Sequence, residues 1–320
     1  MQLKPDLQVS VATAQAIVDR VASGEAVAGV SRLHGGELAA IHEISFADPA
    51  HRPLVLKIYP DALHWKMQKE VMIAGLVRDR LSVAVPRILL ADDSKTLLGL
   101  NWTLMTKLDG LVLGQIETAF TPAQRASEHR QIGRLLREFH RIAMTAFGYI
   151  GAKDIVTPHP TNHAYMTHQF QRKLREFAER GGEPALARRI SGHVEARAHL
   201  FGGCTQAVLC HNDLHAGNLL ASTADGDVRL TGVVDFEGAL AGDPLMDVAK
   251  AAFYLTDEPR RALLDGYGPI ERAHVSQTLN LYHLYFVLEL WCWMAQIGQT
   301  QRLAALAAQL EASCASPARP

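Results

Sequence analysis

Apolar residues gather in short runs over the first hundred residues of the chain and recur at helical spacing over most of the remainder. Short apolar runs bounded by polar or turn-forming residues are typical of strands. They predict strands at residues 28–33, 39–46, 54–59, 85–90 and 97–105. Helical periodicity adds an opening helix at residues 11–22 and a long helix at residues 63–81 to this strand-rich part.

After the turn signal Asp109-Gly110 the pattern becomes mainly helical. Thr121-Pro122 has the order of a helix cap followed by proline, so we expect a helix from there to about residue 143. The later elements are a helical region at residues 162–200 with breaks at 181–184 and 191–192, strands at residues 207–210, 218–221 and 228–234, and helices from residue 245 almost to the end.

This order of elements predicts an α+β fold of two lobes. Residues 1–108 would form a small strand-rich lobe with one long helix, and residues 109–312 a larger, mainly helical lobe. Residues 313–320 are small and rich in proline and are expected to fray.

Composition narrows the class of protein. Hydrophobic residues make up 48% of the chain and charged residues 20%, which is enough apolar material for a sizeable core. The net charge of −1 gives no global field that would attract nucleic acid or an anionic membrane. The longest apolar segment, residues 279–297, contains His283, Glu289 and Gln296, so it predicts a core helix rather than a membrane span.

The first residues lack the pattern of a signal peptide, and the four cysteines have neither metal-ligand spacing nor a small-domain disulfide pattern. We therefore expect free thiols and a cytoplasmic location.

Candidate chemistry lies in the segment from His211 to Asn218, which reads His-Asn-Asp-Leu-His-Ala-Gly-Asn. Asp213 and Asn218 stand five positions apart, and Asp235 follows an apolar run in Val-Val-Asp-Phe-Glu. Phosphoryl transfer needs a carboxylate to accept the proton of the attacking hydroxyl, and an amide oxygen and a second carboxylate to hold Mg²⁺ on the phosphates. The spacing matches the kinase pattern, in which Asp-Phe-Gly takes the place of Asp-Phe-Glu.

Each of these residues has a simpler interpretation when taken alone. Asp213 could lie in a solvated turn, Asn218 could cap a turn, and Asp235 could end a strand. The three residues at this spacing favour chemistry over the separate structural roles.

On these segments the chain resembles the aminoglycoside phosphotransferase and choline-kinase-like family, which shares the bilobal protein-kinase fold. The resemblance covers about residues 28–297, and its segments follow the family's order: 55–59, 104–110, 211–218, 235–237 and 242–249. Only a few residues separate Glu237 from Gly242, so there is no room for the long activation segment of a protein kinase. The resemblance therefore points to a small-molecule substrate.

The resemblance also implies the roles of individual residues. Asp213 would be the catalytic base, and Asn218 and Asp235 would bind Mg²⁺. Lys57 would hold the phosphates of ATP or GTP, and Glu70, thirteen positions further on, would hold Lys57. The alternative for Glu70 is a solvated helix face.

Weaker expectations concern the remainder of the nucleotide site and the support of the loop. Gly35 and Gly36 would let a hairpin backbone close over the phosphates, although such a pair is usually only a turn. Met105, Thr106 and Leu108 would border the purine, through backbone groups at the last two. His211 and Asp247 would support the catalytic loop without touching substrate, whereas His215 is expected to be a loop residue.

Family precedent makes an aminoglycoside, a cationic hydroxyl compound, the leading acceptor, and choline, ethanolamine, homoserine or a sugar the alternative. Glu237 and Glu289 are candidate contacts to a cationic acceptor. The alternatives are that Glu237 only solvates its loop and that Glu289, if buried, is paired or hydrogen-bonded within the protein. A helical insert expected at residues 147–203, which would supply other substrate contacts, is fairly basic. The aromatic residues of segment 282–293 would form either a cage for quaternary ammonium or, more simply, part of the core.

Two further classes stay open from the sequence, namely a nucleotide-binding module without turnover and a kinase that acts on proteins. The sequence leaves the choice of nucleotide, the oligomeric state and a resistance or metabolic role undecided.

Overall fold

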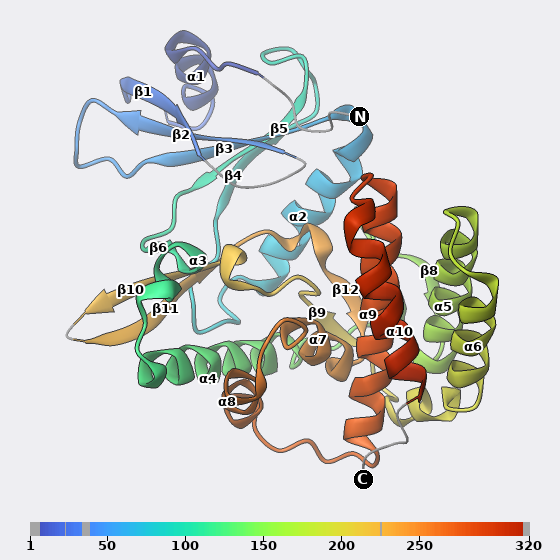
Figure 1. The fold of residues 1–320 in the computed structure, drawn as a ribbon. Helices are drawn as coiled ribbons and strands as arrows, with labels where there is room; N and C mark the ends of the chain where they lie inside the picture. The colour runs from blue at the N-terminus through green and yellow to red at the C-terminus, as the bar shows by residue number, and fades with distance from the viewer. Residues whose placement is uncertain (1–6, 23, 34–38, 225, 316–320) are drawn as a thin grey trace. The chain divides into compact units, whose positions relative to one another are not determined.

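A computed structural model describes residues 7–22, 24–33, 39–224 and 226–315 of the chain (Figure 1). The chain divides into two compact units. The first comprises Met1–Glu128, Ile150–Asp154 and His215–Gly238, and the second His129–Tyr149, Ile155–Leu214 and Ala239–Pro320. Both units are discontinuous in sequence, whereas the predicted lobes are continuous, and the predicted lobe boundaries stay a prediction.

The first unit is built on a five-stranded antiparallel sheet with the strand order β1-β2-β3-β5-β4. Its strands are β1 (Val27–Arg32), β2 (Ala40–Phe46), β3 (Leu54–Tyr59), β4 (Ile88–Asp92) and β5 (Asn101–Thr106). All five strands were predicted. The last begins later than expected, because Lys95 and Gly99 have positive φ angles, 61° and 67°, and form a turn before it.

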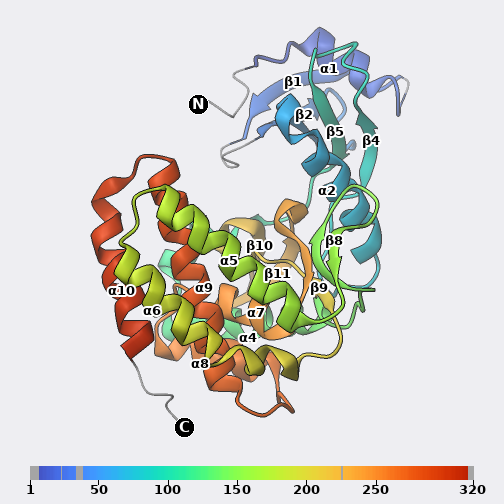
Figure 2. The same cartoon turned by 90° about the vertical axis from the view of Figure 1, so that its right-hand side faces the viewer.

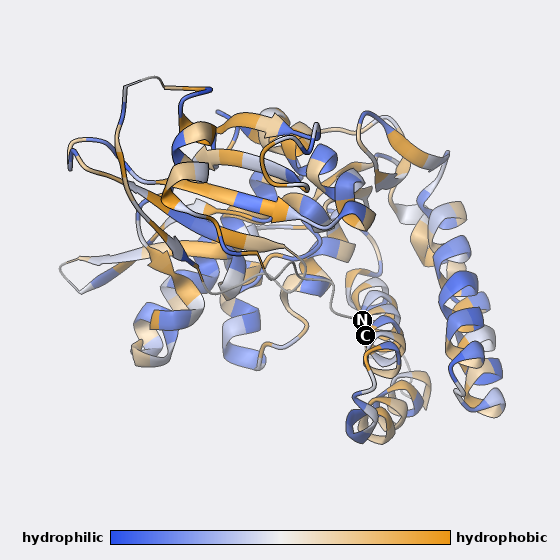
Figure 3. Cartoon of the chain, turned by 90° about the horizontal axis from the view of Figure 1, so that it is seen from above, coloured by the Kyte–Doolittle hydropathy of each residue, from blue (hydrophilic) through white to orange (hydrophobic). Residues whose placement is uncertain are grey.

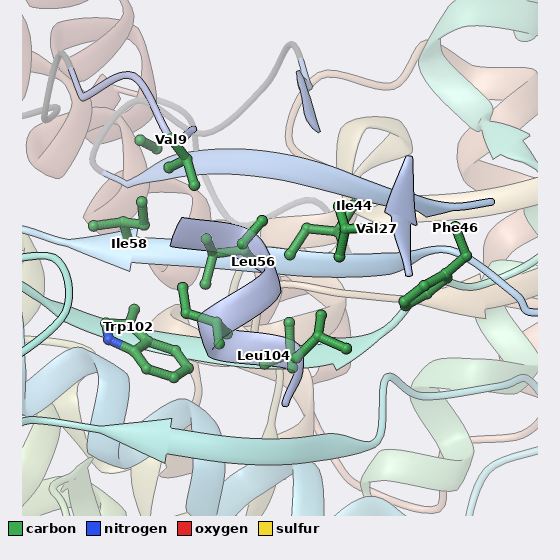
Figure 4. Close-up of a cluster of buried hydrophobic side chains, with 12 residues drawn as sticks. Val9, Val27, Ile44, Phe46, Leu56, Ile58, Trp102 and Leu104 are labelled. Atoms are coloured by element: carbon green, nitrogen blue, oxygen red, sulfur yellow. The ribbon is translucent and has the colours of Figure 1, made fainter. Parts of the chain in front are cut away.

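One face of this sheet is buried by helix α1 (Val11–Val18), which was also predicted. Ser10 caps the helix by accepting a hydrogen bond from the Thr13 amide. The helix places Ile17 in the same buried cluster as Ile44 and Leu56, and Figure 4 shows the strand residues of this cluster. Alternate residues of β2 are buried, which is the period expected of a strand with one face in the core.

Helix α2 (His64–Val77) is the long helix predicted in this part of the chain, and it ends earlier than expected. Asp79 has a φ of 61°, a left-handed conformation that stops an α-helix. The unit also contains a second antiparallel sheet of β6 (Leu111–Val112), β10 (Leu219–Ala224) and β11 (Asp227–Val233), beside the short helix α3 (Leu113–Ile116).

The second unit is mainly helical. Figure 2 shows α5 (Asn162–Glu179), α6 (Pro184–Glu195), α9 (Val275–Gln296) and α10 (Leu303–Ala315) side by side. The other helices are α7 (Pro244–Ala251), which packs on α9, and α8 (Asp257–Tyr267). Residues of α4 (Pro122–Phe139), the helix predicted from Thr121-Pro122, belong to both units.

Three local predictions were wrong. The insert at 147–203 is not helical throughout, because it begins with strands β7 (Phe147–Ile150) and β8 (Ile155–His159). Helix α6 continues through Ser191 and Gly192, because Ile190 and Val194 on either side bury their side chains and outweigh the low helix propensity of glycine. Ser313 lies in α10 rather than in a frayed tail, and residues 316–320 lie outside the described part of the chain.

Tyr282, Tyr285, Phe286 and Trp291 of α9 belong to the core, whereas Trp293 is half-buried. Tyr282, Tyr285 and Trp291 are each at most 5% exposed, and they pack against Phe201, Phe170 and Phe177. In Figure 3 the helices carry both hydrophilic and hydrophobic residues, whereas several strands are hydrophobic over most of their length. Over the described residues, no helix combines the length and hydropathy that a membrane crossing needs. All four cysteines are free thiols, as predicted.

Helices α4 and α8 approach each other at a pair of glycines. A Cβ atom on Gly266 would lie 2.0 Å from the carbonyl oxygen of Arg130, and one on Gly133 would lie 2.0 Å from that of Leu263. Because backbone atoms would have to move, we expect Gly266→Ala to lower the free energy of unfolding by about 1–3 kcal/mol, measured by urea denaturation.

The control for this substitution is Gly192→Ala, since a Cβ atom there meets nothing within 4 Å. It should leave stability unchanged or raise it by up to about 1 kcal/mol. Equal stability of Gly266→Ala and the wild type would show that this helix crossing is not tightly packed.

Candidate active site

Lys57 lies in the middle of β3, between Ile41 of β2 and Thr103 of β5, and its side chain is buried. Its Nζ atom donates to Glu70 Oε2 at 2.8 Å and to Asp235 Oδ1 at 3.2 Å. Strand β3 therefore places a lysine where it meets one carboxylate from α2 and one from the segment after β11. The structure forms the predicted pair of Lys57 and Glu70.

The surroundings favour the charged form of Lys57. Burial alone would lower the pKa of Lys57, but the negative charge of Glu70, with smaller effects from Tyr59, Asp235 and Glu237, raises that pKa well above its usual value. Tyr59 stands two residues further along the same strand and donates its hydroxyl to Glu70 Oε2 at 2.6 Å. Glu70 thus accepts two hydrogen bonds at one oxygen and is fixed in position.

Asn218 and Asp235 lie at the same end of the β10–β11 ribbon. Leu219 is paired with Val233, and the amide of Val234 donates to the backbone oxygen of Asn218 at 3.0 Å. The antiparallel register therefore brings together two residues that are seventeen positions apart in the sequence. Asp235 has a φ of 67°, a left-handed conformation that aspartate tolerates better than most residues.

A carboxylate oxygen from each of Glu70, Asp235 and Glu237 lies within 4.8 Å of the other two. Carboxylate and amide oxygens are the hard donors that Mg²⁺ prefers, so Asp235 and Asn218 fit the predicted metal site. Glu237 instead pairs with Lys66 of α2, with 3.0 Å between Oε1 and Nζ. The residue that stands in place of the glycine of Asp-Phe-Gly therefore bonds to α2.

Lys69 lies one turn along α2 from Lys66 and is only 1% exposed. Burial, reinforced by the positive charge of Lys66 and opposed by Glu237, lowers the pKa of Lys69 to about 8. In the unfolded chain the pKa returns to the ordinary value of 10.5. At neutral pH this site therefore holds a buried ammonium at a cost in folding free energy.

We expect Lys69→Met to raise the free energy of unfolding at pH 7 by about 3 kcal/mol, since each pKa unit corresponds to about 1.4 kcal/mol. Below about pH 8 the lysine is charged in both states, and the full cost is present. Between about pH 8 and 10.5 this lysine is neutral in the folded protein but still charged in the unfolded chain. The free energy of unfolding of the wild type therefore rises relative to that of the variant as pH increases through this range.

Urea denaturation of both proteins from pH 6 to 10 measures this difference. Lys153→Met, which removes an exposed lysine, is the control and should change stability little. A difference between Lys69→Met and the wild type that stays constant with pH would contradict a low pKa at Lys69.

The segment predicted to border the purine ends β5. Met105 is buried beside Val55 and Ile88, its partners in the neighbouring strands. The amide of Thr106 donates to the carbonyl oxygen of Arg87 at 3.0 Å, so this amide is already engaged. Leu108 is then the better candidate in this segment for an amide contact to a base. Gly35 and Gly36 lie outside the described residues.

The predicted catalytic loop follows β9 (Val208–Cys210) in the second unit. Asp247 of α7 is buried and accepts the backbone N–H groups of His211 and Asn212, each at 2.8 Å, while His140 Nε2 lies 3.2 Å from its Oδ2 atom. Burial would raise the pKa of Asp247, but the hydrogen bond and charge of His140 and the bonds from the loop hold it below its usual value. The predicted support of the loop by Asp247 is confirmed.

The neighbouring loop residues lie in different environments. His211 is fully buried with its ring against Phe139, in agreement with a supporting role. Asp213 is half-buried. His215 accepts a hydrogen bond from the Gly217 amide and caps the next turn. Helix α7 thus fixes the backbone immediately before Asp213.

Glu289, the second candidate contact to a cationic acceptor, lies on α9 and pairs with Lys250 of α7, with 3.0 Å between Oε2 and Nζ. Its charge is therefore already balanced by an ammonium group of the chain itself.

Sequence reasoning missed the contacts of Tyr59 with Glu70 and of Lys66 with Glu237. The alternation of side chains along β3 could have indicated Tyr59, since residues two apart in a strand point to the same face. No sequence signal indicated the partner of Lys66, because it depends on how α2 packs against the segment after Asp235.

Comparisons with known proteins agree with this geometry. A family model described as the phosphotransferase enzyme family matches residues 39–276. No curated protein matches the sequence.

Solved structures share the fold at low sequence identity. A thermostable mutant of aminoglycoside phosphotransferase APH(4)-Ia, in a ternary complex with ADP and hygromycin B, is 17% identical with a TM-score of 0.70, over 96% of this chain and 99% of that chain. The GDP and kanamycin complex of APH(2")-IIia is 13% identical with a TM-score of 0.69, over 94% of this chain and 97% of that chain.

Proposed function

The chain belongs to the phosphotransferase enzyme family, and from this premise we propose that it transfers the γ-phosphate of ATP or GTP to a hydroxyl group of a small molecule. The observation that carries the proposal is the buried lysine of β3, whose Nζ atom bonds to carboxylates of both α2 and the segment after β11. A lysine held by a helix glutamate beside a second carboxylate is the arrangement that enzymes with the protein-kinase fold use to transfer a phosphoryl group from a nucleotide.

On the nucleotide side, Lys57 donates to phosphate oxygens and Glu70 holds its ammonium group in place. Tyr59 helps to fix Glu70 by donating its hydroxyl to the same carboxylate oxygen, Oε2. Asn218 and Asp235 supply the oxygen ligands for Mg²⁺, which would neutralise charge on the phosphates when bound.

On the acceptor side, Asp213 accepts a hydrogen bond from the reacting hydroxyl and takes up its proton. The new O–P bond forms as the bond from the γ-phosphorus to the oxygen that bridges to the β-phosphate breaks, and ADP or GDP leaves. The transition state of such transfers is largely dissociative, so orientation of the hydroxyl contributes as much as its deprotonation. This is why the loop must be rigid, and Asp247 supplies that rigidity through two backbone hydrogen bonds.

The ligands of solved structures with the same fold suggest which nucleotides and acceptors to test first. Structures of the same fold hold ADP with hygromycin B and GDP with kanamycin. ATP and GTP are therefore both tested, with aminoglycosides as the first acceptors and choline, ethanolamine, homoserine and simple sugars as the next. A cytoplasmic location and a role in antibiotic resistance stay predictions.

The test measures ADP and GDP release in the presence of Mg²⁺ across this panel and with a small-molecule cell extract, using Asp213→Asn as the blank. Release above the blank that depends on one compound would support the proposal. Binding of Mg²⁺-nucleotide without a phosphorylated product from any hydroxyl compound would instead favour a binding module without turnover. Labelling of protein from radioactive ATP would favour a protein kinase.

A further inference from the structure

A group of polar side chains surrounds Arg172 in the second unit. None of these side chains has a role in the active site proposed above. We call this group the Arg172 cluster. It consists of Tyr149 from β7, Tyr165, Gln169 and Arg172 from α5, and Tyr285 from α9. Tyr165, Gln169 and Tyr285 are each at most 3% exposed, whereas Arg172 and Tyr149 are half-buried. The cluster therefore has a buried floor and a partly open side.

Within the ranges that the structure describes, the guanidinium group of Arg172 is hydrogen-bonded to neutral groups only. Its Nη2 and Nε atoms donate to Gln169 Oε1 at 2.7 and 3.2 Å, and Nη2 lies 3.5 Å from the Tyr149 hydroxyl. The Tyr285 hydroxyl donates to the same Gln169 oxygen at 3.4 Å. Among the described residues no carboxylate lies within salt-bridge distance of Arg172, and Nη1 has no partner there.

The hydroxyl of Tyr165 is a second observation that points to a ligand. Tyr165 is 1% exposed, and within the described part of the chain its hydroxyl has no hydrogen-bond partner. A buried hydroxyl without a partner costs free energy, so such groups are uncommon unless something else satisfies them. The rings of Tyr149 and Tyr165 lie 6.4 Å apart between their centroids, and Tyr165 is within electrostatic range of Arg172. These two hydroxyls and the free side of Arg172 are therefore close enough to offer donors to one bound group.

The acidic residues near the cluster are engaged with other lysines or arginines. Glu289 pairs with Lys250, and Glu176 pairs with Lys173 and Arg180. Both carboxylates attract Arg172 at longer range, but neither forms an ion pair with it. Within the described part of the chain Arg172 therefore has no ion-pair partner, and together with these two carboxylates and their own cationic partners the cluster keeps a net positive charge. A polycation would meet a like charge here, whereas an anion would neutralise it.

The register of the four-stranded sheet locates the cluster near the catalytic loop within the same unit. Tyr149 of β7 is paired with Leu240 of β12 (Leu240–Gly242), and Leu240 is paired with Cys210 of β9. Adjacent strands lie about 4.8 Å apart, so Tyr149 stands about 10 Å across the sheet from Cys210. The next residues after Cys210 form the loop that contains Asp213. This separation suits two ends of one small molecule.

We propose that the Arg172 cluster binds a carboxylate of the acceptor, so that the substrate is a hydroxy acid rather than a polycationic aminoglycoside. This inference rests on the proposed function and specifies its substrate class. The planar guanidinium group can hold a carboxylate through two parallel hydrogen bonds, and tyrosine hydroxyls can donate to the remaining lone pairs. The hydroxyl to be phosphorylated would lie at the other end of the molecule, toward Asp213.

The first test is binding to the full chain at constant ionic strength, measured by calorimetry. The probes are glucuronate, glucose and glucosamine, which share one ring and differ in charge, together with malate, glycolate and the polycation kanamycin. We expect at least one hydroxy acid to bind at least tenfold more tightly than both glucose and glucosamine. Arg172→Met should weaken that binding by about tenfold or more, as expected for the loss of a charged hydrogen bond.

The matched control is Arg175→Met, which removes an exposed arginine from the same helix and should leave the affinity unchanged. Tyr165→Phe, which keeps the ring and removes only the unpartnered hydroxyl, should weaken binding severalfold without loss of folding. Binding of glucosamine or kanamycin as tight as that of every hydroxy acid would overturn the inference, and so would an equal affinity of wild type and Arg172→Met.

A second test separates this inference from the proposed function. Product formed from the cell extract and γ-labelled ATP by the wild type, but not by Asp213→Asn, is identified by mass spectrometry. A labelled product that carries a carboxylate supports both proposals. A labelled product that carries only amines overturns the hydroxy-acid inference and leaves the kinase standing. Absence of any labelled product, with hydroxy-acid binding intact, counts against turnover alone.

Discussion

Asp213→Asn is expected to lower kcat by about 10²- to 10⁴-fold, the range in which a positioned general base contributes to catalysis. Asparagine keeps the size and polarity of the side chain but cannot take up the proton of the attacking hydroxyl. The dissociation constant of the Mg²⁺-nucleotide should stay within about twofold of the wild-type value, because the proposed nucleotide contacts come from Lys57, Asn218 and Asp235. Steady-state kinetics and nucleotide titration measure the two quantities separately.

Asp235→Asn gives the contrasting pattern. It removes a carboxylate from the proposed metal site and should weaken nucleotide binding in the presence of Mg²⁺ as well as turnover. If Asp213→Asn weakened nucleotide binding as much as Asp235→Asn, Asp213 would belong to the nucleotide site rather than act as the base. Wild-type turnover in Asp213→Asn would remove the role assigned to Asp213 altogether.

Asp247→Ala is expected to lower the free energy of unfolding by about 3–5 kcal/mol, as found when one partner of a buried charged network is removed. The carboxylate accepts two backbone N–H groups, those of His211 and Asn212, and contacts His140. Its removal leaves these buried donors without acceptors, and each costs about 1–3 kcal/mol. Urea denaturation measures the loss.

Asp257→Ala is the control for Asp247→Ala, because Asp257 lies in the first turn of α8 with its side chain 87% exposed. It should change stability by no more than about 1 kcal/mol. A similar small effect at Asp247 would mean that the loop is held by other contacts. Asp247→Asn, which keeps one acceptor oxygen, should lie between Asp247→Ala and the wild type.

The strands and most helices could be predicted from the sequence because they depend on local periodicity. The five strands of the first sheet and helices α1 and α2 follow from the spacing of apolar residues, and α4 follows from the cap signal Thr121-Pro122. The hairpin of β7 and β8 was missed because its strands are short and three residues of β8 are exposed, so no apolar alternation marks them. The predicted break at Gly192 was wrong because burial of the neighbouring side chains Ile190 and Val194 stabilises helix α6 more than the glycine weakens it.

The candidate site was predictable where its residues lie in fixed sequence motifs. The spacing of Asp213, Asn218 and Asp235 is by itself enough to indicate chemistry, and the contact between Lys57 and Glu70 followed from the resemblance. The pairing of Glu237 with Lys66 and of Glu289 with Lys250 could not be predicted, because each joins segments whose approach is set by tertiary packing. Both carboxylates, which the sequence offered as candidate contacts to substrate, form ion pairs with lysines of the chain.

Lys57 forms charged hydrogen bonds to two carboxylates, and this links the binding of nucleotide to the binding of metal. In the structure the Lys57 ammonium donates to Glu70 and to Asp235. A phosphate that takes a hydrogen bond from Lys57 competes with Asp235 for it, and the released carboxylate is then available to a cation. The nucleotide should therefore increase the affinity for Mg²⁺, and Mg²⁺ should increase the affinity for the nucleotide by the same factor, since such coupling is reciprocal. In Lys57→Met this mutual factor should shrink toward one.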